Sequence, residues 1–342
     1  MILKDFNELR SFLQTPRNIV IVGHKNPDGD AMGSTLGLYH YLKMKGHQPQ
    51  VLVPNEYPNF LRWLPGSKHL YLFDKQNSQA KRAIKRSEII FLLDFNTLHR
   101  VGSDMQNTLE EYPNDFALID HHLQPDEFPY MYSDPNMCST SEMVYHFMEL
   151  MEDVNLVDKN IATCLYTGIM TDTGSFRFRS TTSTTHRVIA DLIDKGAEND
   201  KIHSNVYDSN SYGRLQLLGQ ALKNLKAIPE YKTAYITISD EEKAENNYKK
   251  GDTEGIVNYA LSLSGIVMAA IFIEDRDQGI VKISFRSKGS FSVNAFARNH
   301  FNGGGHENAA GGRSDVPLDE TVTKFISLLP QYEKELISSY EN

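Results

Sequence analysis

The sequence IVIVGHKNPDGDAMGS, residues 19–34, joins a short apolar run to a polar turn. Residues 19–22 are apolar and β-branched, which predicts a buried strand. A proline and a glycine then interrupt regular structure, and the same turn holds His24, Asp28 and Asp30. Functional sites in open α/β sheets lie at the carboxyl ends of the strands. We therefore expect these three side chains, all of metal-ligand type, to mark such a site.

Two later segments repeat this arrangement of an apolar run followed by ligand-type residues. Residues 91–93 (FLL) run into Asp94, and residues 116–119 (FALI) run into the triplet DHH at 120–122. A further aspartate, Asp172, lies just past a predicted helix. A lone aspartate after a strand is usually a turn former or a helix cap. Capping does not explain three strand ends that all carry ligand-type residues.

Five of the eight candidate ligands are carboxylates, which is more than one metal ion needs. The candidates are His24, Asp28, Asp30, Asp94, Asp120, His121, His122 and Asp172. Carboxylates gathered without partners repel each other, and two divalent cations that share a bridging aspartate would remove this repulsion. Mixed imidazole and carboxylate ligation suits Mn²⁺, with Mg²⁺, Co²⁺ and Zn²⁺ as alternatives. Two ions roughly 3.5–4 Å apart catalyse in-line displacement at phosphorus.

The order of apolar runs predicts an α/β protein with two domains. Over residues 1–195, strands alternate with helices, which predicts a mostly parallel sheet covered by helices on both faces. Residues 196–219 are expected to form a helical linker. Residues 220–342 are expected to form a smaller α/β domain, in which runs at 266–273 and 280–286 form a hairpin. The second run alternates apolar and polar residues, as a half-buried strand does.

One helix start carries a specific signal. Ser139 is followed three residues later by Glu142, which is the pattern of a capping box, in which each side chain bonds the other residue's backbone N–H. An apolar stripe follows it. We therefore expect a helix to begin at this point.

Composition limits the class of protein. The 342 residues are 40% hydrophobic and 23% charged, which indicates a globular protein with substantial cores. No apolar run approaches the roughly 20 residues of a membrane helix, and the first residues lack the pattern of a signal peptide. With only two cysteines, Cys138 and Cys164, a reduced cytoplasm is expected. The net charge of −9 argues against binding long duplexes through a general basic surface.

The segment GGGH at 303–306 lies within a locally basic stretch. Residues 282–313 contain one acid, Glu307, and these cations: Lys282, Arg286, Lys288, Arg298 and Arg313. Glycines let the backbone approach a ligand closely and can expose N–H groups as an anion-binding nest. A glycine run alone is usually a flexible surface loop. In an acidic chain, however, this basic stretch favours a phosphate site.

The motif HxxxDxD at 24–30, followed by Asp94, DHH at 120–122 and Asp172, resembles the four motifs of the DHH phosphoesterase superfamily. The resemblance implies that His24, Asp28 and Asp94 hold one Mn²⁺, and that Asp30, Asp94, His121 and Asp172 hold another. Asp94 would then bridge the two ions. Asp120 would support the histidines, and His122 would act in catalysis by pointing toward the substrate phosphate.

The GGGH segment is similar to a loop of the DHHA1 domain, the usual partner of DHH domains, and residues 255–261 (GIVNYAL) resemble another DHHA1 signature. This resemblance implies that the second domain binds substrate through Asn258, Arg286, Gly303, Gly304, Gly305 and His306, with Arg286 also acting in catalysis. The order of the two domains is most similar to the NrnA-type enzymes. Those enzymes are oligoribonucleases that act on very short RNA and phosphatases of 3′-phosphoadenosine 5′-phosphate (PAP).

The leading expectation is a manganese-dependent phosphoesterase that hydrolyses short oligoribonucleotides (nanoRNA, dinucleotides such as pApA), PAP, or both. Its partners would be small phosphorylated nucleotides, with no long duplex and no membrane, and a homodimer is one option for its assembly. Three alternatives stay open. They are a cyclic or linear dinucleotide phosphodiesterase, a manganese inorganic pyrophosphatase, and a nucleotide-binding module without catalysis.

Overall fold

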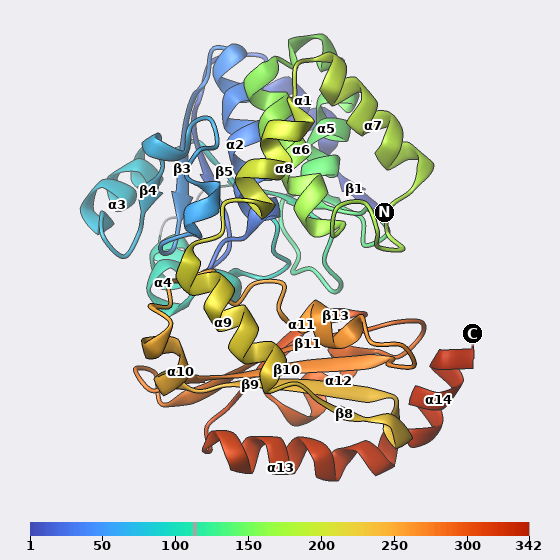
Figure 1. Ribbon diagram of the computed structural model, residues 1–342. Coiled ribbons are helices and arrows are strands. Elements are labelled where there is room, and N and C mark those ends of the chain that lie inside the picture. Colours follow the sequence, from blue (N-terminus) through green and yellow to red (C-terminus); the bar gives the residue numbers. More distant parts are fainter. Residues whose placement is uncertain (112–114, 342) are drawn as a thin grey trace. The chain divides into compact units, whose positions relative to one another are not determined.

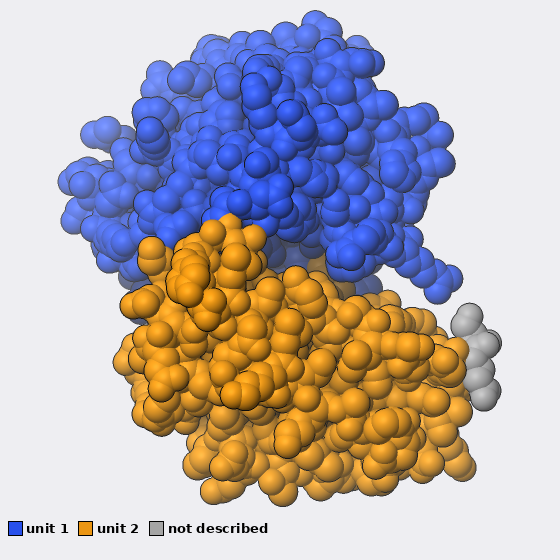
Figure 2. Space-filling model, in the orientation of Figure 1, with its two compact units in different colours: residues 1–209 blue, residues 210–342 orange. Residues whose placement is uncertain are grey.

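The computed structural model describes residues 1–111 and 115–341, and the chain divides into two compact units (Figure 1). The first unit is Met1–Ser209 and the second is Asn210–Asn342, coloured separately in Figure 2. The division falls inside the predicted linker, 196–219, so that helix α8 (Asn199–Tyr207) belongs to the first unit. None of the helices among the described residues is long and apolar enough to cross a membrane.

The first unit is built on a seven-stranded sheet in the order β1-β7-β6-β5-β2-β3-β4. Its strands are β1 (Ile2–Lys4), β2 (Asn18–Val22), β3 (Gln48–Val53), β4 (Tyr71–Leu72), β5 (Ile89–Leu93), β6 (Asp115–Asp120) and β7 (Tyr130–Ser133). All neighbouring strands are parallel except β1 and β7, which are antiparallel. The predicted parallel sheet is therefore confirmed, with one antiparallel strand at its edge.

Helices cover both faces of this sheet, as the continuous apolar strands require. They are α1 (Phe6–Phe12), α2 (Gly29–Met44), α3 (Asn77–Arg86), α4 (Ser103–Glu111), α5 (Thr140–Leu150), α6 (Lys159–Asp172), α7 (Ser183–Asp194) and α8. On β2, Ile19 and Ile21 pack into one core with α2, α5 and α6. Val20 and Val22 pack into a second core with α3 and α4. Successive side chains of one strand thus enter opposite cores.

Two helix ends differ from their predictions. Ser139 caps α5 as expected, because its hydroxyl accepts the N–H of Glu142 at 3.0 Å. The return half of the capping box does not form, because the carboxylate of Glu142 is buried and accepts from Cys138 Sγ and Thr185 Oγ1 instead. Asp172, expected just past a helix, is the last residue of α6. Helix ends commonly shift by one or two residues.

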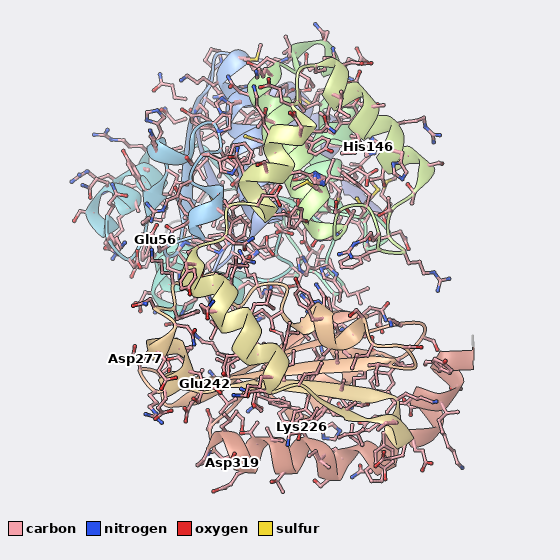
Figure 3. The ribbon with its side chains drawn as sticks, viewed as in Figure 1. Glu56, His146, Lys226, Glu242, Asp277 and Asp319 are labelled. Atoms are coloured by element: carbon pink, nitrogen blue, oxygen red, sulfur yellow. The ribbon has the colours of Figure 1, made fainter. Side chains whose placement is uncertain are left out.

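The second unit has a six-stranded sheet in the order β12-β13-β11-β10-β9-β8. Its elements are α9 (Tyr212–Lys223), β8 (Lys226–Ile228), β9 (Thr233–Ile238), α10 (Asp240–Glu245), α11 (Val257–Leu261), β10 (Met268–Asp275), β11 (Ile280–Ser287), α12 (Val293–His300), β12 (Gly304–His306), β13 (Ala309–Ser314), α13 (Leu318–Leu328) and α14 (Glu333–Glu341). The predicted hairpin is confirmed as β10 and β11. Ser239 is the N-cap of α10, and the carboxylate of Glu242, labelled in Figure 3, accepts its N–H and also accepts from Gln220 and Asn224.

Candidate metal centre

The first group of ligand-type side chains surrounds the start of α2. His24 follows β2 by two residues, and Asp28 is the N-cap of α2. Asp28 Oδ1 accepts the N–H groups of Asp30 and Ala31 at 3.0 and 3.1 Å, so this aspartate caps the helix. The cap also fixes Asp28 with Oδ1 3.9 Å from His24 Nε2. Capping and metal ligation are therefore compatible at this residue.

Asp94 lies between two groups of ligand-type side chains. It is the residue directly after β5 and is 2% exposed. Its Oδ2 lies 3.5 Å from His24 Nε2, and its Oδ1 lies 3.6 Å from His121 Nε2. Its backbone is in the left-handed region, with φ 65°, which aspartate adopts more readily than most residues. The two oxygens of one carboxylate thus face two different histidines.

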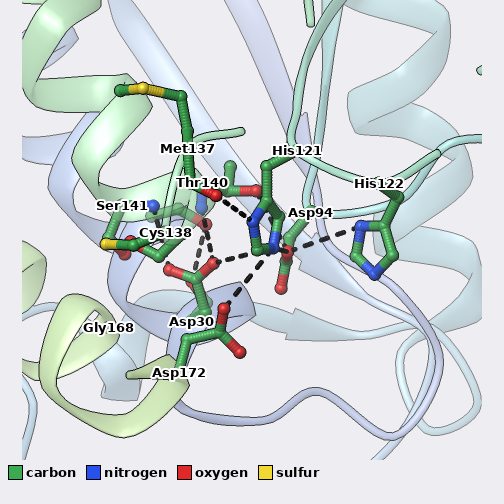
Figure 4. Close-up of polar contacts among 12 residues, drawn as sticks. Asp30, Asp94, His121, His122, Met137, Cys138, Thr140, Ser141, Gly168 and Asp172 are labelled. Carbon is green, nitrogen blue, oxygen red and sulfur yellow. Dashed lines mark hydrogen bonds and ion pairs between the residues drawn. The ribbon is translucent and has the colours of Figure 1, made fainter. Parts of the chain in front are cut away.

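His121 directs one ring nitrogen toward three carboxylates (Figure 4). Its Nδ1 lies 3.1 Å from the carbonyl oxygen of Met137, so Nδ1 carries the hydrogen and donates it. Its Nε2 lies 3.9 Å from Asp30 Oδ2 and 3.6 Å from both Asp94 Oδ1 and Asp172 Oδ2. A ring held by its far nitrogen in this way presents the other nitrogen as a ligand.

Asp120 holds His122 rather than His121. Asp120 Oδ1 lies 2.7 Å from His122 Nδ1, and Asp120 Oδ2 accepts the backbone N–H of His122 at 3.0 Å. Asp120 is completely buried. The contact orients the His122 ring and puts its hydrogen on Nδ1.

The cluster of carboxylates around Asp94 concentrates negative charge. Burial raises the pKa of Asp94 well above its ordinary value, and the neighbouring Asp30 carboxylate raises it further. Burial also raises the pKa of Asp30, against the opposing effect of His121. Burial alone would lower the pKa of His121, but Asp172, Asp94 and Asp30 together raise it to about 9. A divalent cation at this place would compensate the carboxylates directly.

The donor atoms fit such a cation. One group that could hold an ion is His24, Asp28 and Asp94, and another is Asp30, Asp94 and His121, with Asp94 in both. Within each group the ligand atoms lie within 4.8 Å of one another. Carboxylate oxygens and imidazole nitrogens suit Mn²⁺ and its neighbours in the transition series, or Mg²⁺ where oxygen dominates. A third grouping, Asp94, Asp120 and His122, includes the hydrogen-bonded pair described above.

Sequence reasoning missed three residues that contact this cluster. Thr140 and Ser141 donate backbone N–H groups to Asp30 at 2.6 and 2.9 Å, and the Thr140 hydroxyl donates to Asp94 at 3.0 Å. The carbonyl group of Met137 binds His121. The predicted helix start at Ser139 was a signal for this position, since a helix N-terminus attracts carboxylates.

In the second unit, strand register aligns two of the predicted substrate residues. Arg286 on β11 and His306 on β12 are both paired with Ala309 on β13. Directly paired residues share a face of a sheet, so the guanidinium and the imidazole side chains leave the same face, on either side of a small alanine. Arg286 Nη1 also donates to the carbonyl of Phe285 at 2.9 Å. Asn258 lies on helix α11.

Residues 304–306 of the glycine segment form strand β12, which pairs with β13. A Cβ on Gly303 would lie 2.0 Å from the carbonyl oxygen of Gly311, so glycine is required by close backbone packing. The N–H of Gly303 donates to the carbonyl of Ala297, and that of Gly305 donates to Asn294 Oδ1. These two N–H groups are used within the unit, contrary to the expected nest. The role of Gly303, Gly304 and Gly305 toward substrate stays a prediction.

Comparison with known proteins agrees with this geometry. Residues 18–169 match the sequence model of the DHH family, N-terminal domain, and residues 218–335 match that of the DHHA1 domain. The bifunctional oligoribonuclease and PAP phosphatase NrnA of Thermus thermophilus is 31% identical over 312 residues, covering 90% of this chain and 88% of that protein. The cyclic-di-AMP phosphodiesterase GdpP of Geobacillus thermodenitrificans is 29% identical, covering 95% of this chain and 49% of that protein.

A solved structure has the same fold. The crystal structure of an exopolyphosphatase-related protein from Bacteroides fragilis aligns with a TM-score of 0.92 and 38% sequence identity, and the alignment covers 97% of each chain.

Proposed function

Because this chain belongs to the DHH family of phosphoesterases, we propose that it uses two divalent metal ions, Mn²⁺ by preference, to hydrolyse short oligoribonucleotides and PAP. The position of Asp94 carries the two-ion part of the proposal. Its two carboxylate oxygens face His24 and His121, which belong to separate groups of ligand-type residues. A carboxylate placed in this way can bridge two ions, as hydrolysis by a metal pair requires.

The chain's own residues divide into two tasks. His24, Asp28, Asp94, Asp30, His121 and Asp172 would hold the metal ions, which when bound would supply a hydroxide and neutralise the phosphoryl oxygens. His122, held by Asp120 through Nδ1, would direct its other ring nitrogen toward a phosphoryl oxygen of the substrate. The protonated ring, which has a hydrogen on each nitrogen, would donate that second hydrogen, and such a fixed donor stabilises the charge that develops in the transition state.

The second unit would supply binding of the nucleotide. Arg286 and His306 leave one face of its sheet at the same level, and a guanidinium binds phosphate oxygens in a bidentate manner. Substrates of two to about five nucleotides are expected to react fastest. A chain with a net charge of −9 repels a long polyanion more strongly than a short one.

A second candidate function rests on the similarity to GdpP. That relative is a cyclic-di-AMP phosphodiesterase, and this chain matches about half of its length. The same metal groups would serve hydrolysis of a cyclic or linear dinucleotide. The two candidate functions use the same metal-dependent hydrolysis, so only the preferred substrate distinguishes them.

A substrate panel tests the proposal. Purified protein with Mn²⁺ is given RNA from dinucleotide to 20-mer, PAP, cyclic di-AMP, pApA and pyrophosphate, and the products are separated by chromatography. The proposal expects the highest kcat/KM for pApA, short RNA or PAP, and no turnover after chelation. A preference for cyclic di-AMP would favour the second candidate. A preference for pyrophosphate or for the 20-mer would contradict both.

Variants of β11 locate the substrate residues. Arg286→Ala should lower kcat/KM at least about tenfold, because a charged hydrogen bond to phosphate contributes roughly 1.5–3 kcal/mol. Lys282→Ala is the matched control, since Lys282 lies on the same strand and pairs with Asp275. Bound Mn²⁺ should be unchanged in both variants. Equal kinetics for Arg286→Ala and the native protein would remove Arg286 from the substrate site.

A further inference from the structure

The segment that leads into α5, residues 137–142, binds the carboxylate of Asp30 through its backbone (Figure 4). The N–H of Thr140 donates to Asp30 Oδ2 at 2.6 Å, and the N–H of Ser141 donates to Asp30 Oδ1 at 2.9 Å. Both oxygens of one metal-ligand candidate are therefore fixed by the first two N–H groups of α5. Helix N-termini bind carboxylates well because these N–H groups lack partners inside the helix.

The same segment reaches two further ligand candidates that come from different strand ends. The Thr140 hydroxyl donates to Asp94 Oδ1 at 3.0 Å, and the Met137 carbonyl accepts from His121 Nδ1 at 3.1 Å. Asp30, Asp94, His121 and Thr140 are buried, and Met137 is partly buried. Residues 137–142, which we call the entry segment, thus connect ligands that follow β5 and β6 with one in the first turn of α2.

Glu142 binds other residues of the entry segment and one residue of a different helix. It is 2% exposed, and its Oε2 accepts from Cys138 Sγ at 2.7 Å and from Thr185 Oγ1, on α7, at 3.1 Å. Its N–H is bound by Ser139. His146, one turn further along α5, lies 3.7 Å from Glu142 Oε1. A buried carboxylate is costly unless it is paired in this way, so these partners are needed to hold Glu142 in its buried position.

We propose that Thr140 and Glu142 are positioning residues of the metal centre: the entry segment holds Asp30, Asp94 and His121 in the arrangement that binds a cation, and Glu142 holds the entry segment. This inference rests on the proposed function only in that the centre binds a divalent metal ion. The physical reason is that ligands held in place before binding lose less conformational freedom when the ion arrives. Groups that orient ligands in this way typically change metal affinity about 10–100-fold when they are removed.

Thr140→Val tests the hydroxyl contact. Valine keeps the shape of threonine and the backbone N–H to Asp30, but it removes the donor to Asp94. The Mn²⁺ dissociation constant, measured by electron paramagnetic resonance titration of the metal-free full chain, should rise about 10–100-fold. Thr140→Ser keeps the hydroxyl and should stay within about threefold of the native value. Thermal unfolding of each metal-free variant shows whether the fold is retained.

Thr35→Val is the matched control. Thr35 is a fully buried threonine of α2 whose hydroxyl donates, among the described residues, to carbonyls of its own helix, Ala31 and Met32. The same substitution there should leave the Mn²⁺ dissociation constant within about twofold. A native dissociation constant in Thr140→Val, or equal losses in Thr140→Val, Thr140→Ser and Thr35→Val, would overturn the role of Thr140.

Thr185→Val tests Glu142 without changing the entry segment itself, and it serves if Thr140→Val does not fold. It removes one donor to Glu142 Oε2 from a different helix, and the Mn²⁺ dissociation constant should rise, by less than in Thr140→Val. In the double variant Thr140→Val/Thr185→Val, the loss should be smaller than the product of the two single losses, because both act through one segment. Two results would remove Glu142 from the positioning role. One is a native dissociation constant for Thr185→Val, and the other is a loss of affinity in the double variant equal to the product of the two single losses.

Metal binding separates this inference from the proposed function. A native chain that binds Mn²⁺ but hydrolyses none of the panel substrates contradicts the proposed activity, and the comparison of dissociation constants still decides the inference. A chain whose variants all bind Mn²⁺ equally, while the native protein cleaves short RNA, contradicts the inference alone.

Discussion

Asp94 combines three properties that are costly separately. It is buried, its φ of 65° lies in the left-handed region, and it stands beside the carboxylate of Asp30. Backbone strain and crowded charge of this kind persist where the surrounding structure enforces them, and they are concentrated at functional sites. At the scale of the single residue, Asp94 is where the ligand groups of the first unit meet.

Replacing Asp94 should affect both ions at once. Asparagine tolerates the left-handed backbone, so Asp94→Asn keeps the local conformation and removes the charge. We expect less bound Mn²⁺ and a fall in turnover of more than about 100-fold, above the range for groups that only support a ligand. Elemental analysis and turnover at saturating Mn²⁺ measure this. His122→Ala should retain the metal and lose rate; near-native turnover in Asp94→Asn would exclude a bridging role.

His146, labelled in Figure 3, makes stability depend on pH. Burial alone lowers its pKa, but Glu142 and Glu149 outweigh burial and the net shift is upward. The pKa of His146 is higher in the folded state than its ordinary value of 6.5. Protonated His146 therefore stabilises the fold fully at a pH below 6.5, and this stabilisation is lost as the pH rises through the folded-state pKa. His146→Gln should therefore lower the free energy of unfolding by up to about 1 kcal/mol more near pH 6 than near pH 9.

Urea unfolding of His146→Gln at the two pH values checks this difference. The same substitution at His69, which is exposed, is the control and should cause equal, small changes at both. A loss for His146→Gln that grows toward high pH would reverse the sign of the expected linkage.

At the scale of elements, the close approach of α2 and α6 places ligands from two helices together. A Cβ on Gly33 would lie 2.6 Å from the Cys164 carbonyl oxygen and 2.8 Å from the Gly168 nitrogen. Only glycine permits this separation of the helix backbones. Asp30, at the start of α2, and Asp172, at the end of α6, therefore both lie within 4 Å of His121 Nε2.

Gly168→Ala should disturb the centre from the side of α6. Its new Cβ would lie 1.9 Å from Ser141 Oγ and 2.8 Å from Asp30 Oδ1, and overpacking of this kind costs about 1–3 kcal/mol. We expect lower stability in urea and weaker Mn²⁺ binding. Gly219→Ala, in helix α9 with no atom within 4 Å of the new Cβ, should instead stabilise by about 0.5–1 kcal/mol. Unchanged Mn²⁺ affinity in Gly168→Ala would show that Asp30 can move without cost.

At the scale of the whole molecule, the described residues of each unit form separate hydrophobic cores. The clusters around the first sheet contain residues up to Val206, and those around the second begin at Leu217. Multidomain chains of this kind often unfold in more than one step. The six residues predicted to ligate metal, His24, Asp28, Asp30, Asp94, His121 and Asp172, belong to the first unit.

Calorimetry of the full chain should therefore resolve two transitions that respond to different changes. Mn²⁺ should raise the unfolding temperature of the first unit only. At a concentration 100 times the dissociation constant, the free energy of unfolding of that unit should rise by about 2.7 kcal/mol. Phe325 is at a fully buried position of the second unit. Phe325→Ala should lower the free energy of unfolding of that unit only, by about 3–5 kcal/mol. A single transition that shifts with both Mn²⁺ and Phe325→Ala would mean that the units unfold together.

Local pattern determined the strands of the first sheet and the ligand residues at their ends. Apolar runs at 19–22, 89–93 and 116–119 lie within β2, β5 and β6, because a strand buried on both faces needs continuous apolar residues whatever its neighbours are. Parallel strands then bring their carboxyl ends to one edge. For this reason, the sequence sufficed to expect His24, Asp94 and His121 near one another.

Only the tertiary structure decided which groups hold these ligands. Asp30 is bound by Thr140, 110 residues away in sequence, and no local spacing encodes that contact. The same holds for Glu142, whose carboxylate accepts from Cys138 and Thr185 instead of completing the predicted capping box. The packing of the chain places those two donors beside the carboxylate and excludes water from it. The glycine segment is a further example, since only the packed structure shows that a Cβ on Gly303 would lie 2.0 Å from the carbonyl oxygen of Gly311. Sequence periodicity reports what each element buries, whereas side-chain partners depend on which elements pack together.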